Sequence, residues 1–429
     1  MTLSAAATDS GAPARELWPA EFVYDGLGRP RRGAAVLVQT SPAPARVVTI
    51  GSFEALRAQH PGVAVRPARR VIAPPPVNAH THLDLSRMPL TPGSYLSFVG
   101  AVVAHARAGG RGLAAAEAGL AETAAAGVRT VGDIVTDERV LARLLGHEGL
   151  QGVAYWEVLG TDPDEAESTF REAVDVVRRF RPLERPGGVR LGLSPHAPHT
   201  VSAPLLQRLA GLAQAEGLPL QIHVAEDPGE LALHATGDGP LREAWGPFLA
   251  RFRPSGRTPI GYLDELGVLA ARPTLVHAVH VTDDDIRRLQ RAGCAVVHCP
   301  RSNALLGSGI FPWAAYARHG VSVALGTDSR GSSPSLSPVD EWRAAVAIHG
   351  SAADPAQLVW AAVKGGHRAL GTPPPRVVRG SLADELWAWP DGAPWPPADA
   401  VASMDAGEPT GSAEPTGSGP VDDVRGASD

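Results

Sequence analysis

The feature that most constrains the fold is an alternation of short apolar runs with Ala- and Leu-rich runs, beginning near residue 71. This alternation is typical of a parallel sheet built from βα units, and eight units over roughly 250 residues suit a (β/α)8 TIM barrel. A doubly wound open sheet is the alternative, but it usually carries a glycine-rich loop where this chain has His-Thr-His. The expected strands are residues 71–77, 128–134, 152–159, 189–193, 218–224, 274–279, 294–299 and 321–326, with helices including 113–126, 203–216, 282–292 and 311–319.

The segments on either side of the barrel predict a smaller unit. Residues 17–73 contain short β-rich pieces separated by Gly and Pro turns. A β-like run near the other end of the chain could return to them, so residues 17–73 with about 376–390 are expected to form a small β-sandwich-like unit. The barrel would then occupy residues 74–370. Residues 391–429 are rich in Pro, Gly and Ser and predict a disordered tail.

The composition narrows the class of partner. With 429 residues, 44% hydrophobic and 20% charged, the chain can bury a large core as a soluble globular protein. A net charge of -6 and the lack of a basic run argue against nucleic acid and anionic membranes, so we expect a small-molecule partner. The start of the sequence has no apolar leader, which favours the cytoplasm. Lys364 is the single lysine, so any mechanism that needs a Schiff-base or carbamylated lysine must use it.

Titratable side chains follow most of the expected strands. His80 and His82 are two residues apart, so on an extended backbone both imidazoles point to the same side, and Asp84 continues that phase. In a barrel the C-terminal ends of all strands meet at one face. One buried histidine is usually a hydrogen-bonded core residue, but histidines at five strand ends and an aspartate at a sixth favour a shared divalent metal. The later strand ends carry His196, His223 with Glu226, His277, His298 and Asp328.

This set of residues resembles the amidohydrolase superfamily, from about residue 17 to residue 370. The resemblance implies that His80, His82, His223 and Asp328 bind one divalent ion per subunit, Zn2+ or Fe2+. Such a donor set leaves a position open for water, and a bound divalent ion lowers the pKa of water so that hydroxide is available at working pH. Members with two metals use a carbamylated lysine on the fourth strand, where this chain has no lysine, so a single ion is expected.

The resemblance also implies catalytic roles beyond metal binding. Glu226 would protonate a ring nitrogen of the substrate, His277 would orient the attacking oxygen, and Asp328 would take a proton from water. Glu226 and His196 would contact the substrate. A helix cap or an ion pair is the structural alternative for Glu226.

Four motifs place the chain with the adenosine and S-adenosylhomocysteine deaminases and the chlorohydrolases of that superfamily. They are His-Thr-His-Leu-Asp at 80–84, His-Val-Ala-Glu at 223–226, His-Cys-Pro-Arg-Ser-Asn at 298–303 and Gly-Thr-Asp-Ser at 326–329. The chain looks most like the branch that deaminates 6-aminodeoxyfutalosine in menaquinone biosynthesis, although that branch typically has Glu in place of Asp84.

The sequence leaves the identity of the substrate open. Asp84, Arg301 and Arg330 are candidate substrate-binding residues, and either arginine could meet the carboxylate of this benzoate-bearing nucleoside or pair with a nearby acid. The alternatives are a deaminase of S-adenosylhomocysteine, methylthioadenosine or adenosine, a chlorohydrolase-type or cyclic-amide hydrolase, and a non-catalytic metal-binding scaffold. A homodimer stays open as the oligomeric state.

Overall fold

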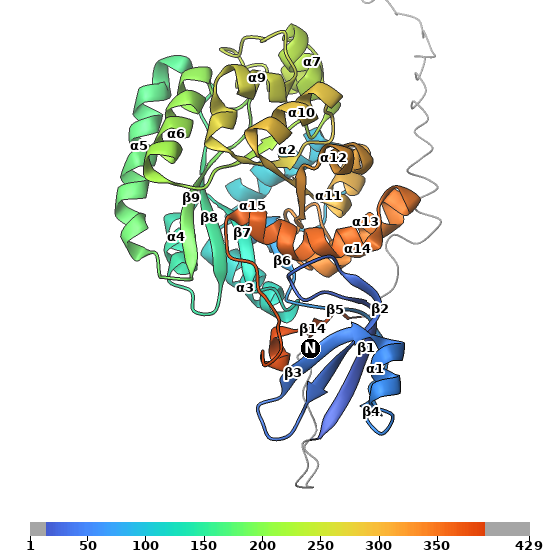
Figure 1. Ribbon diagram of the computed structural model, residues 1–429. Helices are drawn as coiled ribbons and strands as arrows, with labels where there is room; N and C mark the ends of the chain where they lie inside the picture. Colours follow the sequence, from blue (N-terminus) through green and yellow to red (C-terminus); the bar gives the residue numbers. More distant parts are fainter. Residues whose placement is uncertain (1–13, 391–429) are drawn as a thin grey trace, which may run out of the picture.

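The computed structural model describes residues 14–390, and eight parallel strands form its larger part. Four strands pair in the order β6-β7-β8-β9 and four in the order β10-β11-β12-β13. Parallel bridges between Leu193 and Leu220 and between Thr81 and Asp328 join the two groups at both seams. The fold is the expected (β/α)8 barrel (Figure 1). The strands are β6 (Val77–Thr81), β7 (Thr130–Val135), β8 (Gln151–Val158), β9 (Val189–Pro195), β10 (Gln221–Val224), β11 (Thr274–His277), β12 (Ala295–His298) and β13 (Ser322–Leu325).

The first barrel strand differs from the predicted run at residues 71–77. Three consecutive prolines, at positions 74–76, interrupt this run because proline has no N–H to donate to a strand ladder. The residues before the prolines form β5 (Arg69–Ala73), which belongs to a smaller sheet, and β6 begins only after them. His80 therefore lies inside the first barrel strand, and His82 is the first residue beyond it.

Helices cover the outside of the barrel, and local sequence signals explain several of their ends. In α10 a capping box joins Thr282 and Asp285, and the helix ends at Gly293, whose φ is 72°. The predicted helices correspond to α3, α6, α10 and α12. The helices are α1 (Phe53–Gln59), α2 (Tyr95–Arg107), α3 (Leu113–Ala125), α4 (Glu138–Leu145), α5 (Ala166–Phe180), α6 (Ala203–Glu216), α7 (Pro228–Thr236), α8 (Pro240–Trp245), α9 (Pro259–Glu265), α10 (Asp283–Ala292), α11 (Pro300–Leu305), α12 (Trp313–His319), α13 (Pro338–His349), α14 (Pro355–Trp360) and α15 (Gly366–Leu370).

A second sheet combines strands from both ends of the described chain. Its order is β14-β5-β1-β2-β3, and β4 pairs with β1. The late strand β14 pairs antiparallel with β5, Trp387 opposite Ala73, so the chain returns as the run near its end indicated. Figure 1 shows this sheet beneath the barrel. The remaining strands are β1 (Arg15–Val23), β2 (Arg31–Gln39), β3 (Arg46–Ser52), β4 (Ala64–Val65) and β14 (Trp387–Ala388).

The predicted disordered tail, residues 391–429, lies outside the described residues. Within residues 14–390, no helix combines the length and the apolar character that crossing a membrane would require.

Candidate active site

The four predicted metal ligands gather where the barrel strands end. His80 lies in β6, His82 follows it directly, and His223 lies in β10; the ligand atoms of these three rings lie within 4.8 Å of one another. Asp328 follows β13, and its Oδ1 lies 3.4 Å from His82 Nε2 and 3.6 Å from His80 Nε2. Burial, with the neighbouring imidazoles, lowers the pKa of His82 and of His223 well below the usual value. Both rings are therefore neutral and can offer a lone pair.

In two of these histidines, His80 and His223, a hydrogen bond from one ring nitrogen determines which other nitrogen can bind a metal. The Nδ1–H of His80 donates to Oε1 of Gln221 at 2.6 Å, and the Nδ1–H of His223 donates to the backbone carbonyl of His196 at 3.1 Å. Gln221 is oriented in turn, because its Nε2 donates to the carbonyl of Ala79 at 3.1 Å. These bonds leave Nε2 of each ring with its lone pair available.

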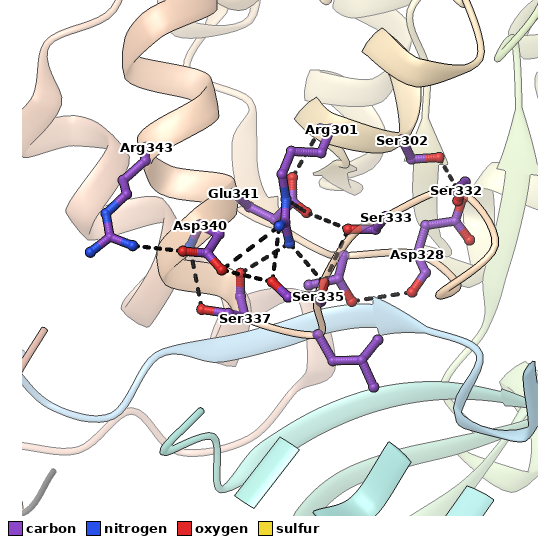
Figure 2. Close-up of polar contacts among 12 residues, drawn as sticks. Arg301, Ser302, Asp328, Ser332, Ser333, Ser335, Ser337, Asp340, Glu341 and Arg343 are labelled. Atoms are coloured by element: carbon purple, nitrogen blue, oxygen red, sulfur yellow. Dashed lines mark hydrogen bonds and ion pairs between the residues drawn. The ribbon is translucent and has the colours of Figure 1, made fainter. Parts of the chain in front are cut away.

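Asp328 is held so that one of its oxygens is directed to the histidines. Its Oδ2 accepts hydrogen bonds from Ser302 Oγ at 2.7 Å and from Ser332 Oγ at 3.0 Å (Figure 2). Its backbone has a φ of 60°, a conformation that costs a residue other than glycine on the order of 1 kcal/mol. Although burial opposes ionisation, the surrounding histidines hold the pKa of Asp328 well below its usual range. Asp328 is therefore a carboxylate.

The four groups fit a divalent metal ion. Nε2 of His80 is buried and has no hydrogen-bond partner among the described residues, which is unusual for a buried polar atom unless it ligates. Three imidazoles and one carboxylate are the donor types that catalytic zinc sites and iron sites use. Lys364 lies away from them and donates to the carbonyl of Leu27 at 3.4 Å. The arrangement thus suits one ion without a bridging lysine.

Glu226 and His277 stand beside this set. Glu226 Oε2 lies 3.5 Å from His277 Nε2. Burial and the nearby carboxylates, Asp328 first among them, raise the pKa of Glu226 well above its usual value, and burial lowers the pKa of His277 to about 4. The Nδ1–H of His277 donates to Oδ1 of Asn303 at 2.9 Å. The site therefore holds a carboxyl group that can keep a proton next to an imidazole that is neutral.

Three of the four candidate ligands, His82, His223 and Asp328, line one cavity together with Glu226. His196 lines it beside the metal ligands: its ring centroid lies 5.0 Å from that of His223, and its Nδ1 is hydrogen-bonded to Thr200 Oγ1 at 2.8 Å. Apolar side chains form another part of the cavity wall. They belong to the turn after His82 and to α2: Leu85, Tyr95, Phe98, Val99 and Val102.

Asp84 does not follow the strand phase into the cavity. Directly after His82 the chain turns into a short 3-10 helix, η1 (Leu83–Leu85), and Asp133 fixes this turn by accepting the N–H of Leu83 at 2.8 Å. Asp84 is fully buried, and its Oδ2 accepts from Arg111 Nε at 2.7 Å. Arg111 does line the cavity. Asp84 therefore acts on the cavity through Arg111 and does not line it itself.

Arg301 and Arg330, the candidate ligands of a substrate carboxylate, are not among the described residues that line the cavity. Arg301 is 2% exposed; its Nε donates to Glu341 at 2.7 Å and an Nη donates to Ser335 at 2.9 Å (Figure 2). Arg330 lies 3.3 Å from Glu122. Each arginine thus pairs with an acidic residue of the chain, Arg301 in a buried position and Arg330 in a partly exposed one.

Two acidic residues that the sequence did not single out also bear on the site. Glu157 in β8 lines the cavity, with a carboxylate oxygen within 4.8 Å of ligand nitrogens of His196 and His223. Glu230 positions Glu226 by accepting its backbone N–H at 2.8 Å. Glu157 is the one charged residue in the expected strand 152–159, a signal that could have found it. Nothing local marks Glu230 apart from an ordinary helix cap.

The fold and the site together define a barrel hydrolase of the metal-dependent class. A model of the amidohydrolase family matches residues 71–375, more than half of the chain. The chain belongs to the amidohydrolase family, and it is a hydrolytic enzyme.

Individual relatives are similar over much of the chain. An aminodeoxyfutalosine deaminase of Deinococcus radiodurans is 47% identical over 378 residues, which are 86% of this chain and 89% of that protein. A 5-methylthioadenosine/S-adenosylhomocysteine deaminase of Natronomonas pharaonis is 31% identical over 62% of this chain and 59% of its own length. The crystal structure of Helicobacter pylori aminofutalosine deaminase with methylthio-coformycin has a TM-score of 0.67 at 22% identity, covering 86% of this chain and 90% of that one. This last likeness concerns the fold alone.

Proposed function

We propose that the enzyme hydrolytically deaminates an adenine-type nucleoside, 6-aminodeoxyfutalosine, giving futalosine and ammonia. The observation that carries the proposal is the 47% identity to the Deinococcus radiodurans enzyme, which extends over 86% of the chain. A deaminase of methylthioadenosine or S-adenosylhomocysteine is the second candidate, favoured by the 31% identity to the Natronomonas pharaonis enzyme.

The geometry supplies a group for each proton that this reaction moves. An oxygen from water replaces the amino group at C6 of the purine, N1 gains a proton, and ammonia leaves. Glu226, whose carboxyl keeps a proton in its buried position, would protonate N1. Asp328 would accept a proton from water and pass it to the departing amino group, and the remaining proton of the attacking oxygen would return to Glu226. His277, neutral with Nε2 toward Glu226, would hold that oxygen by a hydrogen bond.

The metal would be held by His80, His82, His223 and Asp328. We propose one Zn2+ or Fe2+ ion per subunit. When bound, a divalent ion lowers the pKa of water and so supplies the nucleophile near neutral pH.

A substrate panel tests the proposal. Purified enzyme loaded with zinc or iron is expected to release ammonia from 6-aminodeoxyfutalosine with a higher kcat/KM than from adenosine, methylthioadenosine, S-adenosylhomocysteine or guanine. Faster release from any of those four compounds would show that the substrate assignment is wrong. Chloride release from a chlorotriazine, or opening of a cyclic amide, without ammonia release from any nucleoside would reassign the reaction itself.

A further inference from the structure

One permanent positive charge lies on the cavity wall. Among the described residues that line the cavity, Arg111 is the one arginine or lysine, and the others are histidines, acids or uncharged side chains. It comes from the loop between α2 and α3, and its side chain is 19% exposed. Arginine stays protonated at any working pH, so this charge is present whenever substrate binds.

Asp84 holds this arginine in place from behind. Asp84 Oδ2 accepts from Nε of Arg111 at 2.7 Å and from Thr136 Oγ1 at 3.1 Å, while the Asp84 carbonyl accepts the N–H of Gly112 at 3.2 Å. Both the guanidinium and the loop that carries it are thus tied to one buried residue. A side chain fixed in this way loses little conformational entropy when it binds a ligand.

One nitrogen of the Arg111 guanidinium nevertheless donates no hydrogen bond within residues 14–390. Its Nη2 is buried and has no hydrogen-bond partner among the described residues. A buried, charged N–H group without a partner is destabilising, so a ligand that accepts a hydrogen bond from it removes that cost on binding. The acceptor that best matches two adjacent guanidinium N–H groups is a carboxylate.

The surrounding wall favours an apolar group that carries this carboxylate. Phe98, Val99 and Val102 of α2 line the same cavity as Arg111. We propose that Arg111 recognises a carboxylate on the part of the substrate remote from the adenine ring, and that Asp84 is the residue that orients it. The proposal rests on the proposed function, because 6-aminodeoxyfutalosine carries a benzoate that adenosine lacks.

Glu157 provides the competing explanation for Arg111. It lines the same cavity and lies close enough for its charge to favour the protonated form of Arg111, although no hydrogen bond or ion pair joins the two among the contacts of the described residues. If Arg111 served only to hold Glu157 or the nucleoside itself, its loss would weaken every substrate equally. Selective loss with carboxylate-bearing substrates separates the two roles.

The test compares 6-aminodeoxyfutalosine with its carboxamide, a neutral analogue of nearly the same shape. For the metal-loaded wild-type enzyme we expect kcat/KM to favour the acid by roughly 10- to 100-fold, the usual worth of a charged hydrogen bond. In Arg111→Gln this ratio should fall close to one, mainly through KM of the acid. Arg111→Lys and Asp84→Asn should give intermediate ratios. Arg107 is an exposed arginine at the end of the neighbouring helix α2. Arg107→Gln is therefore the matched control and should keep the wild-type ratio.

The outcomes separate this proposal from the proposed function. An unchanged acid-to-amide ratio in Arg111→Gln, whether all activity falls or none does, would overturn the role of Arg111 and leave the substrate assignment standing. If the wild type instead prefers S-adenosylhomocysteine, the substrate assignment fails, and the ratio of S-adenosylhomocysteine to methylthioadenosine in the same variants tests carboxylate recognition directly. A wild type that acts best on nucleosides without a carboxylate would refute both.

Discussion

Hydrogen bonds made behind His80 and His223 determine which nitrogen of each ring faces the other candidate ligands. His80 is the clearest case, since Gln221 receives its Nδ1–H at 2.6 Å and is itself fixed by a bond to a backbone carbonyl. Partners of this kind raise ligand basicity and hold the ring in one orientation. Metal affinity should therefore depend on a residue that is not a ligand.

Replacing Gln221 by Leu tests this dependence. The substitution keeps a similar volume and removes the acceptor, so His80 loses the bond that fixes its tautomer. We expect zinc affinity, measured by competition with a chelator, to fall about 10- to 100-fold while the fold persists. Gln290→Leu, at an exposed position of α10, serves as the control and should bind zinc as the wild type does. Equal affinities in Gln221→Leu and wild type would mean that the hydrogen bond does not support the ligand.

At the scale of secondary-structure elements, the site depends on how closely β6 approaches β13. A Cβ added at Gly326 would lie 2.8 Å from Cβ of His80 and 2.9 Å from its backbone nitrogen. Both are closer than atoms of this kind pack, and neither can move without moving β6. Glycine at this position lets the first and last barrel strands meet.

Gly326→Ala should therefore displace His80 from the other ligands. We expect less than one metal ion per subunit after dialysis, and a loss of stability of about 1–3 kcal/mol, typical of overpacking in a core. Metal analysis and thermal melting in excess zinc measure the two effects. Gly28→Ala, where an added Cβ meets nothing within 4 Å, is the control. Full metal content in Gly326→Ala would show that the barrel seam tolerates the shift.

The sequence predicted those parts of the site that depend on strand ends and missed those that depend on turns. His223 and Asp328 could be placed at strand ends because the first lies near the end of one apolar run and the second follows another. Asp84 could not, since the bond from Leu83 N–H to Asp133 that turns the chain joins residues 50 positions apart. Arg111 was missed for the same reason: its loop has no period, and only the folded chain brings it to Asp84. The prolines at 74–76 did carry a local signal for the true start of the first strand.

Across the whole molecule, several histidines are buried without charge, and this determines how the enzyme responds to acid. Burial lowers the pKa of His234, His349 and His367 to about 4 each. Between pH 6.5 and 4 these groups bind a proton when the chain unfolds and not when it is folded. The free energy of unfolding therefore rises with pH through this window and falls as the solution is acidified.

His234 is not a candidate metal ligand, so its contribution to the pH dependence of the unfolding free energy can be measured separately. It packs against Phe252 and Tyr262, and both its ring nitrogens lack partners among the described residues. Between pH 7 and pH 4.5 the free energy of unfolding should fall in both proteins. The fall should be about 2 kcal/mol smaller in His234→Leu than in the wild type. Urea unfolding of both proteins at the two pH values gives this difference directly. Parallel losses in the two proteins would show that His234 does not titrate on unfolding.

The barrel seam joins residues that are far apart in the chain, since the bond from Thr81 to the Asp328 carbonyl spans 247 positions. A polypeptide that grows from its N-terminus thus exposes His80 and His82 long before it has made the carboxylate that completes their donor set. The smaller sheet is completed later still, because β5 receives its second neighbour only when Trp387 has been made. Contacts this distant form slowly and late. The full donor set therefore exists only once residue 328 has been made, and a translation product that stops before it has the imidazoles but neither the closed ring nor the site.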